Sequence, residues 1–296
     1  MLGADDHDPG FSISPTFLSR DELKRMGFTR HRLERAVAER RIIRVRKGRY
    51  VHGNLDPDLV TVAKLGGRLD CVSLVRRLGV FVWDASLPLH IQVDVGASRL
   101  PPRPSAVVCH WRTSRAREFE LVADVVEALA QAVRCQGPRE AIAMLDSALH
   151  NRLIDQRALG LVFARLPRRF TALRGLLDAR SESGAESLMR LILRTLGCDV
   201  DLQVKISGVG RVDFILDGWL IVECDSETHH SGWGAQKRDR RRDLAAARVG
   251  YTTVRVIAED IFFHRDEVRE ALTDVLAHGP RRQTRRQNSS VPGAAR

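Results

Sequence analysis

Three acidic residues lie within or at the end of apolar segments in the C-terminal third of the sequence. Asp213 lies in the run Arg-Val-Asp-Phe-Ile-Leu, and Glu223 and Asp225 end the run Trp-Leu-Ile-Val-Glu-Cys-Asp. A carboxylate in an apolar strand costs free energy unless it meets a cation, and neighbouring carboxylates repel one another. A divalent metal relieves both effects, and hard oxygen ligands suit Mg²⁺ or Mn²⁺. The pattern predicts a divalent-metal site; the alternative is a set of acids at strand ends facing solvent.

The spacing of these acids also constrains the loop between their strands. With a two-residue turn at Asp217 and Gly218, Asp213 would pair with Val222 and face away from Glu223. With a three-residue loop, residues 217–219, Asp213 lies directly opposite Glu223. The metal site therefore predicts the three-residue loop or a bulge. Asp225 shares the face of Glu223 because side chains alternate along a strand.

The elements that must position these acids span residues 181–277. A helix begins at Ser183 or Gly184 and ends at Gly197, and it carries Glu186 as a further candidate metal ligand. The segments expected to follow are strands at 199–206, 210–216 and 219–225, a basic helix at 237–249, a strand at 251–257 and a helix at 265–277. The order is αβββαβα, and the crossover through the basic helix predicts that the strands flanking it are parallel.

The basic helix and the loop before it supply further candidates. Lys237, Arg238 and Arg241 are expected to contact phosphates, although a salt-bridged surface helix has the same composition. His229 and His230 lie in the preceding loop. Histidine titrates near neutral pH, so either one is a candidate acid, base or metal ligand.

The N-terminal segment 19–53 has the pattern of a winged helix-turn-helix. Ser19 and Glu22 form a capping box, Thr29 caps a second helix, and the alternating run 42–51 turns at Lys47-Gly48 as a hairpin does. A helix of this kind fits the DNA major groove. The predicted DNA contacts are Arg30, Arg32, Arg35, Arg44, Arg46, Lys47 and Arg49. A small helical adaptor that binds protein is the alternative.

Charge supports a nucleic-acid partner. The formal net charge of the 296 residues is +11, and residues 19–53 hold twelve lysines and arginines against four acids. Residues 278–296 form a second basic segment, expected to be a disordered tail, and residues 1–18 an acidic flexible tail. The sequence shows no run of 18 apolar residues and no secretory signal, so we expect a cytoplasmic protein with no membrane contact.

The middle region, 54–180, mixes helix and strand signals and is expected to act as a linker or interaction platform. His90 and His110 have no acidic partner at usable spacing, so we interpret each as a structural histidine. The five cysteines are scattered without metal-ligand spacing, and we interpret them as reduced thiols.

Two resemblances cover the ends of the chain. Residues 19–53 resemble the N-terminal winged helix of AbiEi-type antitoxins. The C-terminal region is similar to domains related to the very short patch repair (Vsr) endonuclease, within the PD-(D/E)xK superfamily. The residues that carry this resemblance are Glu186, Arg211-Val-Asp213-Phe, Glu223-Cys-Asp225, His229-His230, Asp239, Asp243, Gly250-Tyr251 and Arg255. This resemblance implies a restriction-endonuclease fold, with Asp213, Glu223 and Glu186 as metal-site acids. The superfamily lysine falls at Asp225, so its role passes to another group, such as His229, His230, Lys205 or Lys237.

The expected architecture is therefore α/β (α+β): a winged helix, a mixed middle region and a restriction-endonuclease-like αβββαβα core. The predicted function is Mg²⁺- or Mn²⁺-dependent DNA cleavage, in repair, restriction or phage defence. The candidate catalytic residues are Asp213, Glu223, Asp225, His229 and His230. One alternative is an AbiEi-like regulator or antitoxin with an inactive nuclease-like domain, for which a toxin or other protein is a partner. Another is an interaction scaffold, and the sequence leaves oligomeric state open.

Overall fold

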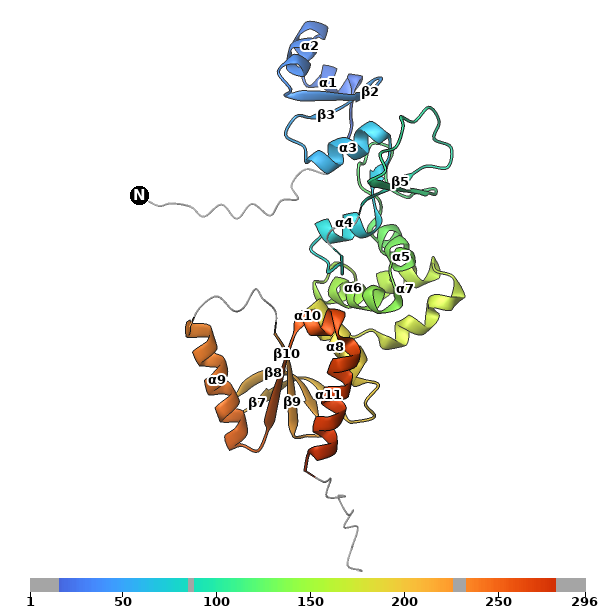
Figure 1. Ribbon diagram of the computed structural model, residues 1–296. Helices are drawn as coiled ribbons and strands as arrows, with labels where there is room; N and C mark the ends of the chain where they lie inside the picture. The colour runs from blue at the N-terminus through green and yellow to red at the C-terminus, as the bar shows by residue number, and fades with distance from the viewer. Residues whose placement is uncertain (1–15, 85–87, 226–232, 281–296) are drawn as a thin grey trace, which may run out of the picture. The chain divides into compact units, whose positions relative to one another are not determined.

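The computed structural model describes residues 16–84, 88–225 and 233–280. The chain divides into two compact units, Met1–Leu191 and Ile192–Arg296, and the division falls within helix α8 (Gly184–Leu193). The fold is mixed α/β, with helices and three small sheets (Figure 1). No helix of the described residues is long and apolar enough to cross a membrane.

The N-terminal elements follow the local signals of the sequence. They are β1 (Leu18–Ser19), α1 (Arg20–Arg25), α2 (Arg30–Ala38), β2 (Ile42–Arg46) and β3 (Arg49–His52), and the sheet order is β1-β3-β2. Ser19 and Glu22 form the predicted capping box, and the Thr29 hydroxyl accepts the Arg32 N–H at the start of α2. Leu23, Ala36 and Tyr50 are buried in a small core between these elements. The predicted helices and hairpin of this segment are confirmed.

The middle elements share one larger core. In chain order they are α3 (Pro57–Leu65), β4 (Arg68–Leu69), α4 (Cys71–Arg77), β5 (Leu89–Val93), β6 (Val107–Trp111), α5 (Val125–Cys135), α6 (Pro138–His150), α7 (Gln156–Ala164) and a 3-10 helix (Arg168–Leu176). In the sheet order β4-β5-β6, β5 pairs antiparallel with β4 and parallel with β6. Residues from all these helices contribute to this core. Helix α3 and strand β4 were not predicted from the sequence.

The second unit is built on a four-stranded sheet in the order β10-β9-β8-β7. Its elements are β7 (Val200–Ile206), β8 (Gly210–Leu216), β9 (Leu220–Asp225), α9 (Trp233–Arg248), β10 (Thr252–Ile257), α10 (Ala258–Phe263) and α11 (Arg265–His278). Strands β9 and β10 are parallel, as the crossover through α9 predicts, and the other two pairings are antiparallel. Helices α9 and α11 lie on opposite sides of this sheet (Figure 1). The short α10 was not predicted, and α9 begins four residues before the expected start at 237.

Candidate functional site

The hairpin between β8 and β9 sets the register of the acidic residues. Its strands pair Leu216 with Leu220 and Phe214 with Val222, which leaves the three-residue loop 217–219. The loop closes with a hydrogen bond from the Trp219 N–H to the Leu216 carbonyl of 3.1 Å. The same register, continued along the strands, places Asp213 opposite Glu223. The three-residue loop predicted from the spacing of the acids is confirmed.

Glu223 is the buried member of this pair. Its side chain is on the sheet face that also carries Ile221, which packs with Ala246 of α9. Burial is the main cause that raises the pKa of Glu223 to about 7, with the negative charge of Asp213 acting in the same direction and Arg242 and Arg255 opposing it. The Arg242 guanidinium donates to Glu223 Oε1 over 2.7 Å. Glu223 is therefore a carboxyl poised between its two protonation states near neutral pH.

Asp213 is held from both neighbouring strands. The backbone N–H of Cys224 on β9 donates to its Oδ2 over 2.9 Å, and the side-chain amide of Gln203 on β7 donates to its Oδ1 over 3.4 Å. Gln203 has a φ of +54°, in the left-handed region. Such a conformation costs of order 1–3 kcal/mol in a non-glycine residue and is concentrated at functional sites. The strand is thus distorted at the residue whose side chain reaches Asp213.

Asp225 occupies the position that the superfamily pattern gives to lysine, and a cation from the next strand lies against it. Arg255 of β10 donates to Asp225 Oδ1 over 3.1 Å and grips Asp243 of α9 with two hydrogen bonds, of 2.8 and 3.2 Å. The Asp243 hydrogen bond is the main reason that the pKa of Arg255 lies above its ordinary value. In the parallel register Arg255 is the direct neighbour of Glu223. A fixed positive charge therefore stands where a lysine was expected.

The donor chemistry of this acidic pair fits Mg²⁺ or Mn²⁺. Asp213 and Glu223 offer hard carboxylate oxygens from adjacent strands on one sheet face, and these are the ligands that such ions prefer. The pKa of Glu223 is raised mainly by burial and next by the charge of Asp213. Arg242 and Arg255 pair with Glu223 and Asp225, so arginine side chains offset part of the negative charge here.

The remaining C-terminal candidates have different positions. Glu186 lies in the first turn of α8, is buried, and accepts the Glu182 N–H at 2.8 Å. His229 and His230 lie outside the described residues. Lys205 is exposed on β7, and the Lys237 ammonium lies over the ring of Trp233, 5.3 Å from its centre. The cations that contact Glu223 and Asp225 among the described residues are Arg242 and Arg255.

Helix α9 presents two kinds of residue. Lys237, Arg238 and Arg241 are exposed, as phosphate contacts require. Arg242 instead contacts Glu223, and Asp243 contacts the site through Arg255. Trp233 begins the helix with 59% of its surface exposed.

The predicted DNA-contact residues of the N-terminal segment divide into two groups. Arg30, Arg32, Arg35, Arg44 and Lys47 are exposed. Arg46 donates to the carbonyl of Arg99 over 3.3 Å. Arg49 lies over the rings of Phe17 and Phe119, with its guanidinium 5.0 and 5.6 Å from their centres. The side chains of Arg46 and Arg49 therefore contact other parts of the protein, whereas those of Arg44 and Lys47 are exposed.

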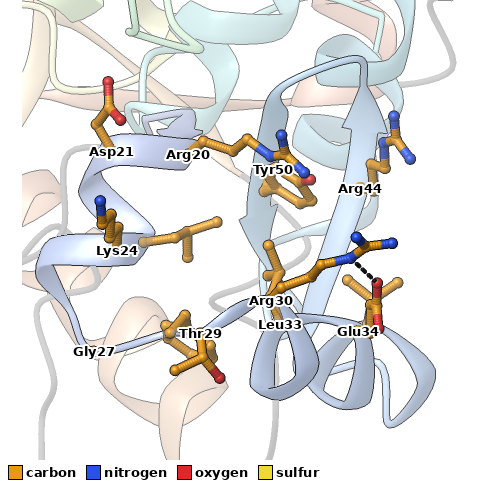
Figure 2. Close-up of a pocket in the computed structure, with 13 residues that line it drawn as sticks. Arg20, Asp21, Lys24, Gly27, Thr29, Arg30, Leu33, Glu34, Arg44 and Tyr50 are labelled. Carbon is orange, nitrogen blue, oxygen red and sulfur yellow. Dashed lines mark hydrogen bonds and ion pairs between the residues drawn. The ribbon is translucent and has the colours of Figure 1, made fainter.

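A hollow of about 1030 Å³ lies between α1, α2 and the hairpin. Figure 2 shows Leu33 and Tyr50 lining it, with Arg20 and Arg44 among the cations at its edge. Arg30 is also at this edge and is paired with Glu34 at 3.0 Å. Cations from two helices and a strand therefore converge on one side of this segment.

A group of potential metal ligands that the sequence did not reveal lies in the middle region. The donor atoms of Cys71, His90, His110 and Cys135 all lie within 4.8 Å of one another. His90 and His110, interpreted from the sequence as structural histidines, are therefore not isolated but lie together with two cysteines. The intervals between these residues are 19, 20 and 25, far from any short ligand spacing, and the only signal was the shared presence of two cysteines and two histidines in one region.

In comparisons with known proteins, no family model matches this chain and no curated protein is significantly similar to it. The functional assignment accordingly rests on the residues and the geometry described above.

Proposed function

We propose that this chain binds DNA and cleaves it by metal-dependent phosphodiester hydrolysis at the Asp213–Glu223 pair. The observation that carries the proposal is the register of β8 and β9, which sets these two acids opposite each other on one face of the sheet. Apposed carboxylates repel each other, and a divalent cation bound between them relieves this repulsion. The raised pKa of Glu223 supports the same conclusion.

Each residue then has a role that its contacts suggest. Asp213 and Glu223 hold the metal. Bound Mg²⁺ or Mn²⁺ supplies Lewis-acid activation of the phosphodiester. The guanidinium of Arg255, fixed by Asp225 and Asp243, provides the positive charge that the superfamily lysine would give. Arginine stays protonated, so Arg255 stabilises negative charge and does not act as a base.

The N-terminal segment is proposed to deliver the chain to DNA as a winged helix. Helix α2 begins with Arg30 and Arg32, both exposed, and arginines near the start of a recognition helix reach base edges and phosphates. Arg44 and Lys47 extend the exposed positive charge onto the hairpin. These contacts neutralise phosphates, and binding is therefore expected to weaken steeply with salt.

Helix α9 adds a second surface for nucleic acid beside the acids. Exposed Trp233 is flanked by Lys237 and by Arg240, whose guanidinium lies 5.6 Å from the centre of the indole ring. An exposed aromatic ring among cations suits base stacking together with phosphate attraction. This surface favours a substrate with unpaired or splayed bases.

The test is a cleavage assay on supercoiled and single-stranded DNA with Mg²⁺ or Mn²⁺ added or omitted. Asp213→Asn is expected to abolish cleavage while DNA binding in a gel-shift assay is kept. Asp201→Asn is the matched control, because Asp201 is an exposed acid on strand β7 of the same sheet. Cleavage that survives in Asp213→Asn would refute the proposed site.

A second candidate function is a DNA-binding regulator whose nuclease-like fold is inactive. The observation that favours it is the closed network of Arg255 with Asp225 and Asp243, together with the Arg242–Glu223 pair, because these contacts neutralise the acids without a metal. DNA binding with no cleavage of any substrate under either metal would establish this candidate in place of the nuclease.

A further inference from the structure

Four side chains from four different elements converge in the middle region of the chain. Cys71 is the first residue of α4, His90 lies on β5, His110 on β6, and Cys135 is the last residue of α5. Two sulfur and two nitrogen donors with all four atoms within 4.8 Å form a compact set. Apolar packing does not explain why two thiols and two imidazoles lie together.

The sheet places the two imidazoles on one face. Strands β5 and β6 are parallel, and His110 pairs with Gln92, two residues beyond His90, so the two histidines are diagonal neighbours on the same side. Helices α4 and α5 each bring one cysteine to this point. His90 is further fixed by a hydrogen bond from its backbone N–H to the Ser73 hydroxyl of 2.9 Å.

The distances are within about 1 Å of those around a tetrahedral ion. His110 Nε2 lies 3.0 Å from His90 Nδ1 and 3.8 Å from Cys135 Sγ. With bond lengths of about 2.0–2.1 Å to nitrogen and about 2.3 Å to sulfur, donors around tetrahedral zinc lie about 3.3–3.8 Å apart. A hydrogen bond between the histidines would account for the first distance, but not for the two thiols that face them.

A side-chain amide supports one of the two sulfur donors. The Gln131 amide donates to Cys135 Sγ over 3.4 Å, a contact typical of the residues that support metal ligands. Cys71 has a φ of +54°, a strained conformation for any residue other than glycine. Glycine would relieve the strain but would offer no ligand atom, so the strain accompanies a side chain with a sulfur donor.

We propose that Cys71, His90, His110 and Cys135 bind one Zn²⁺ ion as a closed, four-ligand structural site. Sulfur and imidazole donors in equal number suit zinc, whereas Mg²⁺ prefers oxygen. Four protein ligands leave no open position, so the ion clamps α4 and α5 to the β5–β6 edge of the sheet. The inference is independent of the proposed nuclease, which uses other residues and another metal.

The test measures metal in the purified full-length chain. Elemental analysis is expected to find about one zinc per chain in the wild type and at least about a five-fold loss in Cys135→Ser. Cys135 is exposed, so this substitution is expected to leave the fold intact, which circular dichroism checks. Cys198→Ser, a half-buried cysteine of the second unit, is the matched control and is expected to retain full zinc.

Cobalt gives a second readout that does not depend on the metal acquired during expression. Co²⁺ added to the metal-free chain is expected to produce the visible bands of a tetrahedral ion and a thiolate charge-transfer band, with the latter about halved in Cys135→Ser. Absence of zinc together with absence of these bands would overturn the proposal. A Cys71–Cys135 disulfide, shown by a thiol count two below five in the unreduced chain, would overturn it as well.

Discussion

At the scale of the residue, Glu223 combines burial with a neighbouring negative charge, and its titration is expected to affect stability. Its pKa in the folded chain is about 7, against an ordinary value of 4.5. A carboxyl whose pKa is raised by folding stabilises the fold below its unfolded pKa, and this contribution is lost as the pH rises through the folded pKa. In metal-free buffer we therefore expect the free energy of unfolding to fall by up to about 3 kcal/mol between about pH 4.5 and pH 8 through this group.

Chemical denaturation across this pH range measures the effect. Glu223→Gln is expected to flatten the dependence, and Glu259→Gln, an exposed acid of α10, to leave it as in the wild type. A Glu223→Gln profile parallel to that of the wild type would show that the carboxyl does not titrate as described.

Arg255 and Asp225 allow a test of the missing lysine. If Arg255 stabilises charge on the reacting phosphate, Arg255→Gln lowers kcat about 10²-fold, the usual effect of removing one such group. Adding Asp225→Lys to this variant puts an ammonium in the superfamily position, where Asp243 remains as its partner. We expect the double variant to recover at least about ten-fold in single-turnover cleavage. An unchanged rate in Arg255→Gln would remove Arg255 from the mechanism.

What the sequence predicts at this scale depends on how far apart the interacting residues are. The capping box of Ser19 and Glu22 and the apposition of Asp213 and Glu223 follow from spacings of three and ten residues across one local turn. By contrast, Arg255 reaches Asp225 from 30 residues further along the chain, and the Cys/His group assembles from four elements. Those partners are brought together by tertiary packing, which the periodicity of the sequence does not predict.

At the scale of the element, the arginines of the hairpin β2–β3 differ in whether they face solvent or pack against the protein. Arg44 is exposed, whereas Arg49 covers the rings of Phe17 and Phe119. Arg44→Ala is expected to weaken DNA binding and to reduce the slope of log affinity against log salt by about 1. Arg49→Ala is expected to lower thermal stability with little change in that slope. Fluorescence anisotropy over a salt series distinguishes the two, and equal slopes for both variants would contradict the division.

Helices α6 and α8 are joined by a buried ion pair between Asp146 and Arg190. Their side chains are 0% and 4% exposed and lie 2.7 Å apart, and Asp146 also accepts the Asp178 N–H. Asp146→Ala leaves a buried guanidinium unpaired, for which we expect a loss of about 3–5 kcal/mol in urea denaturation. Asp178→Ala removes a pair whose Arg180 partner is 60% exposed, and it is expected to cost about 1 kcal/mol or less from the lost pair. A small loss in Asp146→Ala would mean that water reaches Arg190.

At the scale of the whole molecule, charge is concentrated where nucleic acid is proposed to bind. The segment 19–53 holds twelve of the 48 lysines and arginines of the chain, and α9 holds a further cluster beside the acids. Binding and chemistry are therefore assigned to different groups of residues. Arg32→Ala with Arg44→Ala is expected to raise KM and leave kcat unchanged, whereas Asp213→Asn lowers kcat without weakening DNA binding. Steady-state kinetics with a gel-shift assay on the same variants tests this separation.

The two proposed metal sites use opposite donor chemistry, so they respond to different treatments. A zinc-selective chelator is expected to remove the ion from Cys71, His90, His110 and Cys135 and to lower the thermal midpoint of the first unit. Omission of Mg²⁺ and Mn²⁺ is expected to stop cleavage while leaving zinc content and that midpoint unchanged. EDTA strips both sites, so inhibition by EDTA does not distinguish them. If zinc removal alone stopped single-turnover cleavage below the new midpoint, the two sites would be coupled, and the zinc would no longer be a purely structural ion.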